Sequence, residues 1–269
     1  MAIPTPRSPA FNRVMSVIEW TGIALFFGSV LLGAARLVGQ AWALGPLALA
    51  ALLLIPVGVV AADVFTGAGH YLADNFGRVD TPVLGHMFIY RFRQHHEDQT
   101  LICLGDFREI NGGLCLLMLP AAATVAALSG GAPSALGLAL GTLVLSFAVG
   151  GAATNQVHRW AHDRACPAPI RLLQRAGILL SPRHHAVHHR SPHHLHFCIT
   201  IGVLNPLLDR IGFWHRLADA LVAIGVPQAE ESVMGHRRAS ALAIATAPRR
   251  AAPAPAAAAA EPGPTITPA

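Results

Sequence analysis

The chain's densest chemical feature is a histidine-rich segment. It reads RHHAVHHRSPHHLHF from Arg183 onward and holds seven histidines within fifteen residues. His185, His188 and His189 follow an i, i+3, i+4 spacing, so on a helix their imidazoles lie on one face. Neutral imidazole is the commonest metal ligand in proteins. A polar loop can carry two or three histidines by chance, but this density indicates a metal site, with His184 one position away from the shared face.

Two other segments repeat the helical spacing. In TNQVHRWAH, His158 and His162 are spaced i, i+4 and point to one side of a helix. In GHYLADNFG, His70 and Asp74 have the same spacing. The carboxylate of Asp74 can ligate a metal or can orient the ring of His70 through its second nitrogen. Taken alone, each pair is also compatible with ordinary polar side chains at a helix end.

A fourth segment, RFRQHHED, supplies His95 and His96. Adjacent residues on a helix point about 100° apart, so these two serve two metals, or one metal and one orienting role. Together the segments offer more imidazoles than the four ligands of one zinc ion, and we therefore expect two metal ions. Imidazole suits iron, copper, nickel and zinc alike, so the spacing leaves the metal open.

The remaining histidines and the cysteines lack this spacing, and we expect them not to ligate. The histidines concerned are His86, His194, His196, His215 and His236. The cysteines, which are Cys103, Cys115, Cys166 and Cys198, contain no C-x-x-C pair. We expect them to be reduced and packed in the interior.

The elements that position these residues are predicted to be membrane helices. Only 12% of the residues are charged and 53% are hydrophobic, whereas a soluble domain has about 25% charged residues. A span needs roughly 20 apolar residues. We expect spans at Trp20 to Ala35, at Leu37 to Ala62, and two within the uncharged run from Ile110 to His158, split at residues 129–134. The predicted class is an all-α integral membrane protein with about four transmembrane helices.

The arginines predict the orientation of these helices, because short cytoplasmic loops carry the excess of positive charge. If the N-terminus is inside, nearly all arginines lie on the cytoplasmic side, and only Arg36 lies near the other face. Because each span carries the chain to the other side of the membrane, the same orientation puts every histidine cluster on the cytoplasmic side. We therefore expect a multi-pass protein of the bacterial inner membrane, with cytoplasmic termini and a cytoplasmic, histidine-rich helical cap.

The chain divides into three parts by composition. Residues 1–15 form a short polar N-terminus, and residues 16–234 form the membrane domain with its histidine-bearing extensions. Residues 235–269 form a tail that is mostly alanine and proline. Such a tail cannot bury a core, and we expect it to be disordered.

Six blocks in a fixed order resemble the plasmanylethanolamine desaturase family, the Kua/CarF-like membrane lipid desaturases. They are GHYLADNFG, RFRQHHEDQT, DFREING, TNQVHRWAH, SPRHHAVHHRSPH and FCITIGVLNPLLDRIGFW, and they span about residues 61–217. Relatives in this family include a plastid phosphatidylglycerol acyl desaturase. The resemblance covers most of the chain outside the termini.

The resemblance implies a centre of two iron ions (Fe²⁺) that uses O₂ as co-substrate. The implied reaction introduces the vinyl ether double bond into an alkyl ether phospholipid, converting plasmanylethanolamine to plasmenylethanolamine. The implied metal ligands are His70, His95, His96, His158, His162, His184, His185, His188, His189 and His193, with the choice between His184 and His185 open. Asp74, Asp106, Glu109 and Asn111 also match family positions, as further ligands or as partners that orient the ligands.

Two departures from the family pattern bear on the substrate. Gly105 precedes Asp106 where we expect a histidine, and His194 follows His193 where we expect an acid. Neither change removes an implied ligand, but both leave the choice of substrate open. The alternative reaction is that of an acyl-lipid desaturase acting on a phospholipid fatty acyl chain near the headgroup, and a hydroxylase ranks third.

The expected partners are a membrane phospholipid and a separate electron donor. Arg93, Arg183 and Arg190 flank the clusters and could hold a lipid phosphate, although the positive-inside rule explains them equally well. No G-x-G-x-x-G fingerprint of a flavin or nicotinamide site is present. We therefore expect a small cytochrome or ferredoxin to dock on the basic face.

Other classes fit the sequence less well. A metal transporter should place its histidines within spans near the midplane, but the run from Ile110 to Thr154 contains none. A scaffold protein needs no convergence of imidazoles. Nothing in the chain predicts binding to nucleic acid, and the oligomeric state is not predicted.

Overall fold

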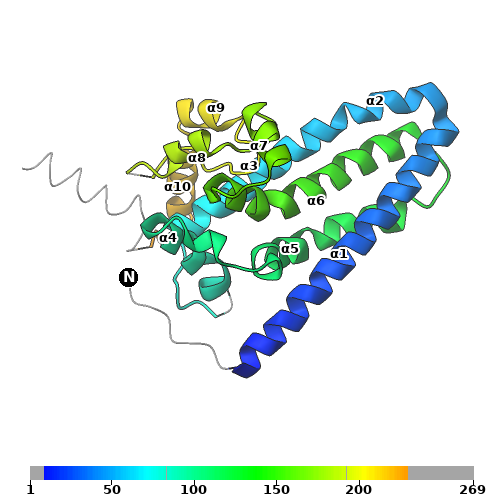
Figure 1. Cartoon of the computed structure of the whole chain (residues 1–269). Helices are drawn as coiled ribbons and strands as arrows, with labels where there is room; N and C mark the ends of the chain where they lie inside the picture. The colour runs from blue at the N-terminus through cyan, green and yellow to red at the C-terminus, as the bar shows by residue number, and fades with distance from the viewer. Residues whose placement is uncertain (1–8, 83, 192, 230–269) are drawn as a thin grey trace, which may run out of the picture.

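The computed structural model describes residues 9–82, 84–191 and 193–229, and Figure 1 shows helices joined by loops. Within these ranges the chain forms no β-strand, only an isolated antiparallel bridge between Phe76 and Gln228. The predicted all-α class is confirmed. The predicted tail at 235–269, residues 1–8 of the predicted polar N-terminus and His236 lie outside the described residues.

Four segments are long and apolar enough to cross a membrane. They belong to α1 (Pro9–Leu44), α2 (Leu49–Leu52) continuing into α3 (Leu54–Asn75), α5 (Phe107–Leu128) and α6 (Ala135–His162). Large apolar side chains on these helices, such as Leu31 and Leu128, are exposed. Broad exposed apolar surfaces of this kind are typical of contact with lipid. The predicted number of membrane helices is confirmed.

The bounds of the first two spans differ from the prediction. α1 continues through Arg36 to Leu44 and does not end at Ala35. The turn comes later, at the 3-10 helix η1 (Gly45–Ala48), where Gly45 has a φ of +61° that favours glycine and Pro46 follows. The second span then runs to Asn75 and not to Ala62, so its last turns contain the first of the predicted ligands.

Arg36 explains why the first helix was predicted too short. A charge usually marks the end of an apolar run, but the guanidinium of Arg36 donates to the carbonyl oxygens of Ala126 and Ala127 near the end of α5. The last carbonyls of a helix lack partners within the helix, so they can accept from this charge. One turn further along α1, Gln40 Nε2 donates to the Ser129 carbonyl at 2.9 Å.

Membrane helices that follow one another in the chain run in opposite directions, so α1 is parallel to α5 and α3 is parallel to α6. α1 packs against α5, and α3 packs against α6. Phe26, Met118 and Ala148 belong to a buried core shared by α1, α5 and α6. A tight turn joins α5 to α6, and the Ser134 hydroxyl caps α6 by accepting from Gly137 N at 3.0 Å. The C-terminal ends of α3 and α6 therefore lie at the same end of the bundle.

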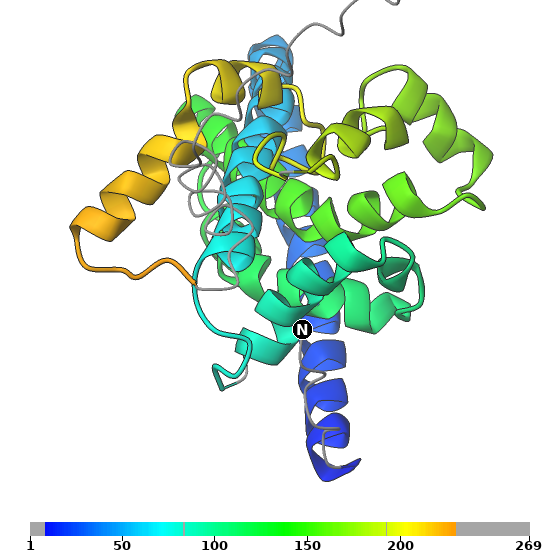
Figure 2. The same cartoon turned by 90° about the vertical axis from the view of Figure 1, so that its left-hand side faces the viewer.

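A cap of short elements covers that end of the bundle, as Figures 1 and 2 show. Its elements are the π-helical turn η2 (Gly85–Ile89), α4 (Tyr90–Glu97), η3 (Leu101–Cys103), α7 (Ala168–Arg175), α8 (Pro182–His188), α9 (Asn205–Arg210) and α10 (Phe213–Ala223). Tyr71, Phe197 and Trp214 form the core that joins the cap to α3. The helical cap is present as predicted, whereas its position on the cytoplasmic side stays a prediction.

Candidate metal centre

Four segments of the chain bring imidazoles to the capped end of the bundle. The C-terminal turns of α3 and α6 each supply an i, i+4 pair, as their spacing predicts. α4 and α8 supply the rest, together with the loop after α8. The residues that gather there are His70, Asp74, His95, His96, His158, His162, His185, His188, His189 and His193.

Five of these residues form the first cluster, which we call the five-histidine group: His95, His158, His162, His185 and His189. Each of the five offers one ring nitrogen, and these five nitrogens all lie within 4.8 Å of one another. His185 Nε2 lies 2.9 Å from Nε2 of His158, of His162 and of His189. Nitrogens about 2.1 Å from one ion lie roughly 3.4 Å apart at the tetrahedral angle and about 3.0 Å apart at a right angle. The spacing therefore fits ligands that share one ion.

The second cluster, which we call the Asp74 group, contains His70, Asp74, His96 and His188. Oδ2 of Asp74 lies 3.2 Å from His70 Nε2, 3.1 Å from His96 Nε2 and 3.7 Å from His188 Nε2. Asp74 and His188 are 0% exposed, and a buried carboxylate is costly unless it is paired or binds a metal. Both roles predicted for Asp74, ligand and orienting partner, are compatible with this geometry.

A third combination, of His96, His189 and His193, connects the two groups. His96 also belongs to the Asp74 group and His189 to the five-histidine group, and their ring centroids are 5.1 Å apart. His193 adopts a φ of +51°, which is uncommon for a residue other than glycine. The two groups are therefore neighbours, and the arrangement fits two ions side by side.

Main-chain carbonyls fix the rings of several histidines. His70 Nδ1 lies 3.1 Å from the Phe197 carbonyl oxygen, and His188 Nδ1 lies 2.8 Å from that of Leu195. Because a carbonyl only accepts, each Nδ1 must carry the proton and each Nε2 must hold the lone pair. Metal-binding histidines typically donate their other N–H in this way. Within the described structure, His188 Nε2 is buried and has no hydrogen-bond partner.

Asp63 holds the segment that supplies these carbonyls. This buried carboxylate on α3 accepts from the backbone N–H of Thr200 at 2.7 Å, of Ile201 at 3.2 Å and of Gly202 at 2.7 Å. Gly67 lets the segment lie directly on α3, since a Cβ there would be 3.1 Å from the Cys198 Cα. Sequence reasoning did not assign Asp63 a role, although an ionisable residue inside a span was the available signal.

Burial also sets the protonation of the cap histidines. It lowers the pKa of His95, His185 and His188 well below the ordinary histidine value, and repulsion from neighbouring imidazoles lowers it further. These rings are therefore neutral near pH 7, the form that ligates a metal. Neutral nitrogens with one buried carboxylate suit iron, zinc, copper or nickel. The residues present thus fit a two-metal centre.

His184 lies apart from both groups. Its Nε2 is 3.1 Å from Asn205 Nδ2, and its ring stacks on His196 with the centroids 4.5 Å apart. Among the described residues, the groups that could hold a metal include His185 but not His184. His194, His196, His215 and the cysteines also lie outside these groups.

Asp106, Glu109 and Asn111, the other predicted acidic and amide residues, form hydrogen bonds at the N-terminal end of α5. Asp106 and Glu109 form a capping box at its N-terminus, in which the Asp106 carboxylate accepts from Glu109 N at 2.8 Å. Asn111 Nδ2 donates to Gln156 Oε1 at 3.1 Å. None of the three belongs to a described metal-binding group.

The three arginines predicted for lipid phosphate differ in their surroundings. Arg93 is buried, and its guanidinium donates to the carbonyls of Ala73 at 3.0 Å and Phe76 at 2.9 Å. It stabilises the end of α3 and is not placed to hold a phosphate. Arg183 and Arg190 are exposed on and after α8.

Comparison with known proteins identifies the family. Residues 59–228 match the lipid desaturase domain family. The chain is 36% identical over 208 residues to plasmanylethanolamine desaturase 1 of Mus musculus, covering 76% of each chain. It is 34% identical over 239 residues to plasmanylethanolamine desaturase of Myxococcus xanthus, covering 87% of this chain and 82% of the relative.

A more distant relative comes from plants. The chain is 33% identical over 159 residues to the chloroplastic fatty acid desaturase 4 of Arabidopsis thaliana, covering 56% of this chain and 46% of the relative. No solved structure matches the chain significantly. The bundle of membrane helices with its histidine-rich end is that of an oxygen-dependent membrane lipid desaturase. The chain belongs to the plasmanylethanolamine desaturase family.

Proposed function

We propose that this enzyme is a di-iron desaturase that forms the vinyl ether double bond of plasmenylethanolamine from plasmanylethanolamine. One observation carries the proposal: eight imidazoles and Asp74, from four separate segments, converge in two adjoining groups at the end of the membrane helices, and His193 lies beside both groups. The names of the mammalian and bacterial relatives support the substrate. The ligand set we propose is the nine histidines of the described groups, without His184.

The reaction removes two hydrogens from adjacent carbons of a saturated chain, which no amino-acid side chain can do alone. Two bound iron ions would supply the oxygen-dependent oxidation. Overall, O₂ takes up the two hydrogens of the lipid together with two electrons and two protons from outside, and two waters and the double bond result. A small cytochrome or ferredoxin would deliver the electrons, docking on the basic surface near Arg183 and Arg190.

The chain's own residues prepare the site for this chemistry. The carbonyls of Leu195 and Phe197 hold His188 and His70 with their Nε2 lone pairs turned away from the backbone. The burial of both rings excludes water from the Asp74 group. Helix ends lie near the headgroup region of a bilayer, which is where the first carbons of an ether-linked chain are found. We propose that this end faces the cytoplasm of a bacterium, in the inner membrane, as the arginine distribution predicts.

The proposal is tested by expressing the chain in a host that lacks plasmalogens and is fed an alkyl ether phospholipid. Wild-type enzyme should produce vinyl ether lipid, and His158→Ala, which removes a buried member of the five-histidine group, should produce less than about 1% as much. His215→Ala is the matched control, because His215 is exposed and outside the metal groups.

The lipid products also distinguish the alternative reaction. New double bonds in fatty acyl chains, without vinyl ether lipid, would replace our proposal with an acyl-lipid desaturase. Iron content of the purified protein should be about two ions per chain in wild type. A protein that is active with no iron bound would overturn the di-iron assignment.

A further inference from the structure

A cavity of about 660 Å³ opens beside the five-histidine group. Its wall includes His95 and His158 and is formed by residues of α1, η2, α4, η3, α5 and α6 and of the loops between them. Cavities of about 300 to 1,000 Å³ are the usual size of small-molecule sites. Among the described lining residues there is no member of the Asp74 group. Of the two groups, only the five-histidine group therefore contributes described residues to the wall of this cavity.

The wall combines an apolar stretch with a charged edge. Ile102, Leu114 and Leu117 are among the many apolar residues that line it. Arg91 lines it as well and stands one helical turn before His95 on α4, so the two share one face at a separation of about 6 Å. The wall thus suits a hydrocarbon chain whose polar end lies close to the histidines.

Two carboxylates also line this cavity. Glu19 pairs with Arg108, and Glu109 Oε1 lies 3.3 Å from Nη2 of the same arginine. Arg91 is exposed, and its Nη1 donates to the main-chain carbonyl of Glu109 at 3.1 Å. Arg108 also pairs with Asp106, so its single charge faces three carboxylates. Arg91 forms no ion pair among the described residues and acts on Glu19 only at a distance, so its guanidinium can accept an anion.

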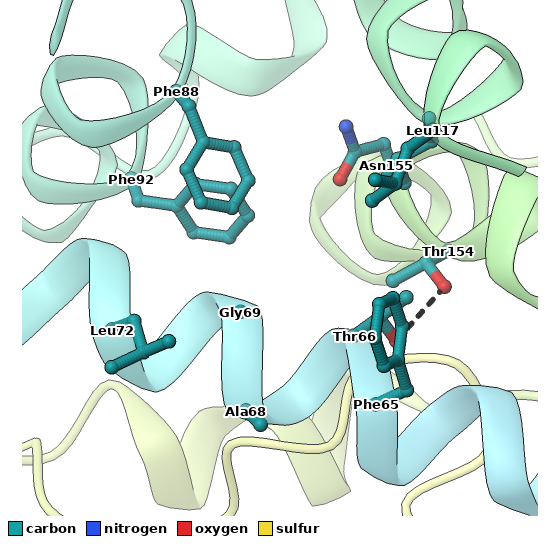
Figure 3. A pocket seen from close by; sticks show the side chains of 11 residues that line it. Phe65, Thr66, Ala68, Gly69, Leu72, Phe88, Phe92, Leu117, Thr154 and Asn155 are labelled. Atoms are coloured by element: carbon teal, nitrogen blue, oxygen red, sulfur yellow. Dashed lines mark hydrogen bonds between the residues drawn. The ribbon is translucent and has the colours of Figure 1, made fainter. Parts of the chain in front are cut away.

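A second, smaller cavity of about 260 Å³ adjoins the first, and the two share Phe88, Phe92 and Leu117 as walls. Figure 3 shows it above α3, with Phe88 and Phe92 on one side and Leu117 and Asn155 on the other. None of its described lining residues belongs to a metal group. A chain lying only there would contact no described residue of a metal group, whereas the larger cavity brings a chain beside His95 and His158.

We propose that the larger cavity binds the reacting hydrocarbon chain of the phospholipid and that Arg91 binds the lipid phosphate. Gly113, which has no side chain, leaves open the space that the hydrocarbon chain occupies. The inference rests on the proposed function, in which the reacting carbons are the first two of the chain. Their place beside the headgroup requires a phosphate site near His95 and His158. Arg91 meets this requirement through its bidentate, permanently charged guanidinium.

Gly113 offers a direct way to fill the cavity. It lies on α5 and lines the cavity, and a Cβ added there meets no atom within 4 Å. A larger side chain therefore enters open space without displacing the fold, and helix propensity rises when glycine is replaced. Gly28 on α1 is a matched control, since a Cβ there also meets no atom within 4 Å and Gly28 does not line the cavity.

The first experiment compares Gly113→Phe with Gly28→Phe on saturated ether phospholipids with short and long alkyl chains. Gly113→Phe should lower kcat/KM for the long chain about 10-fold or more, and less for the short one. Gly28→Phe should leave both unchanged. Equal rates in Gly113→Phe and wild type would overturn the assignment of the cavity.

A binding experiment separates this inference from the proposed function. Purified full-length enzyme is irradiated with a phospholipid that carries a diazirine in one chain, and the modified peptides are mapped. Modification should fall on residues 101–104 and 114–117, should be lost in Gly113→Phe and should persist in Gly28→Phe. Modification unaffected by Gly113→Phe would overturn the inference. If the enzyme oxidises only acyl lipids, the proposed function fails, while this mapping and the chain-length test on acyl lipids still decide the cavity.

The phosphate site is tested with Arg91→Gln and, as its control, Arg216→Gln, which removes an exposed arginine of α10 that does not line the cavity. Arg91→Gln should raise KM about 10-fold with little change in kcat, and Arg91→Lys should recover part of the loss. Arg216→Gln should leave KM unchanged. A purely structural role for Arg91 would lower kcat and thermal stability together, and that result would remove Arg91 from the proposal.

Discussion

The five-histidine group and the Asp74 group lie side by side but differ in what surrounds them. The five-histidine group has only nitrogen donors, and two of its members line the larger cavity. The Asp74 group includes a carboxylate, and main-chain carbonyls fix two of its three rings. One group is open to a ligand, and the other is enclosed by the chain.

This difference indicates a division of tasks between the two groups. A metal held beside a cavity can meet a substrate, whereas a metal enclosed by fixed rings is held in position. We expect substitutions in the Asp74 group to act mainly through metal retention. Substitutions along the larger cavity should act mainly through the substrate.

The largest effect that sharpens the comparison is expected for Asp74→Asn. The amide keeps the size of the carboxylate but removes the charge that faces His70, His96 and His188. Activity should fall about 100-fold, and iron should drop from about two ions to about one per chain. Elemental analysis of the purified protein alongside the lipid assay measures both quantities.

Asp80→Asn is the control for this substitution, because Asp80 is exposed and pairs only with exposed Arg78 in the described structure. Loss of both ions in Asp74→Asn would mean that the two groups bind metal as one unit. Retention of both ions with full activity would remove Asp74 from the centre.

A smaller effect is expected for Asp63→Asn, which leaves every proposed ligand in place. It acts on the segment at residues 195–202, whose carbonyls fix the rings of His70 and His188. The amide cannot accept all three N–H groups of residues 200–202, and unsatisfied buried groups cost about 1 to 3 kcal/mol each. Thermal stability should fall, and activity should drop about 10-fold because His70 and His188 lose their fixed carbonyls. Thermal unfolding and iron content measure these effects.

Asp63→Asn should release the metal of the Asp74 group before that of the five-histidine group when a chelator is added. Simultaneous release of both metals, at the wild-type rate, would contradict the role given to Asp63. Asp80→Asn again serves as the control for a change of one surface charge.

The smallest effect is the pH dependence of stability in the metal-free protein. His95, His185 and His188 have folded-state pKa values below the ordinary value of 6.5 because they are buried. The unfolded chain therefore binds more protons below pH 6.5, so the stability present above that pH is lost as the pH falls through it. The melting temperature should drop by about 5 °C or more between about pH 7.5 and about pH 5.5.

Metal-loaded protein provides the contrast for this measurement, because a coordinated nitrogen cannot take up a proton. Its melting temperature should change less over the same range. Equal pH dependence with and without metal would show that other groups control the acid response.

Helix spacing carried most of the predictive information in the sequence. The i, i+4 pairs His70 with Asp74 and His158 with His162 each lie on one helix face, and both meet the histidines of α8. The number of membrane helices followed from the apolar runs, since the bilayer fixes their length. Which residues bind metal in solution stays a prediction.

Tertiary contacts account for what the sequence did not reveal. Arg36 looked like a helix boundary because its partners, the carbonyls at the end of α5, are distant in sequence. Arg93 looked available for a phosphate, but the end of α3 uses its guanidinium. Arg91 was overlooked, although its i, i+4 relation to His95 was present in the sequence.

The carbonyl contacts of His70 and His188 affect how freely this protein can change over generations. Every amino acid carries the same backbone oxygen, so exchanging the side chains at Leu195 and Phe197 leaves those two acceptors in place as long as the segment keeps its path. The orientation of the two rings is thus determined by the path of the main chain and not by the identity of the side chains at these two positions. Anyone transplanting this centre into a new scaffold must reproduce that path, because copying the histidines alone would leave their rings free to turn.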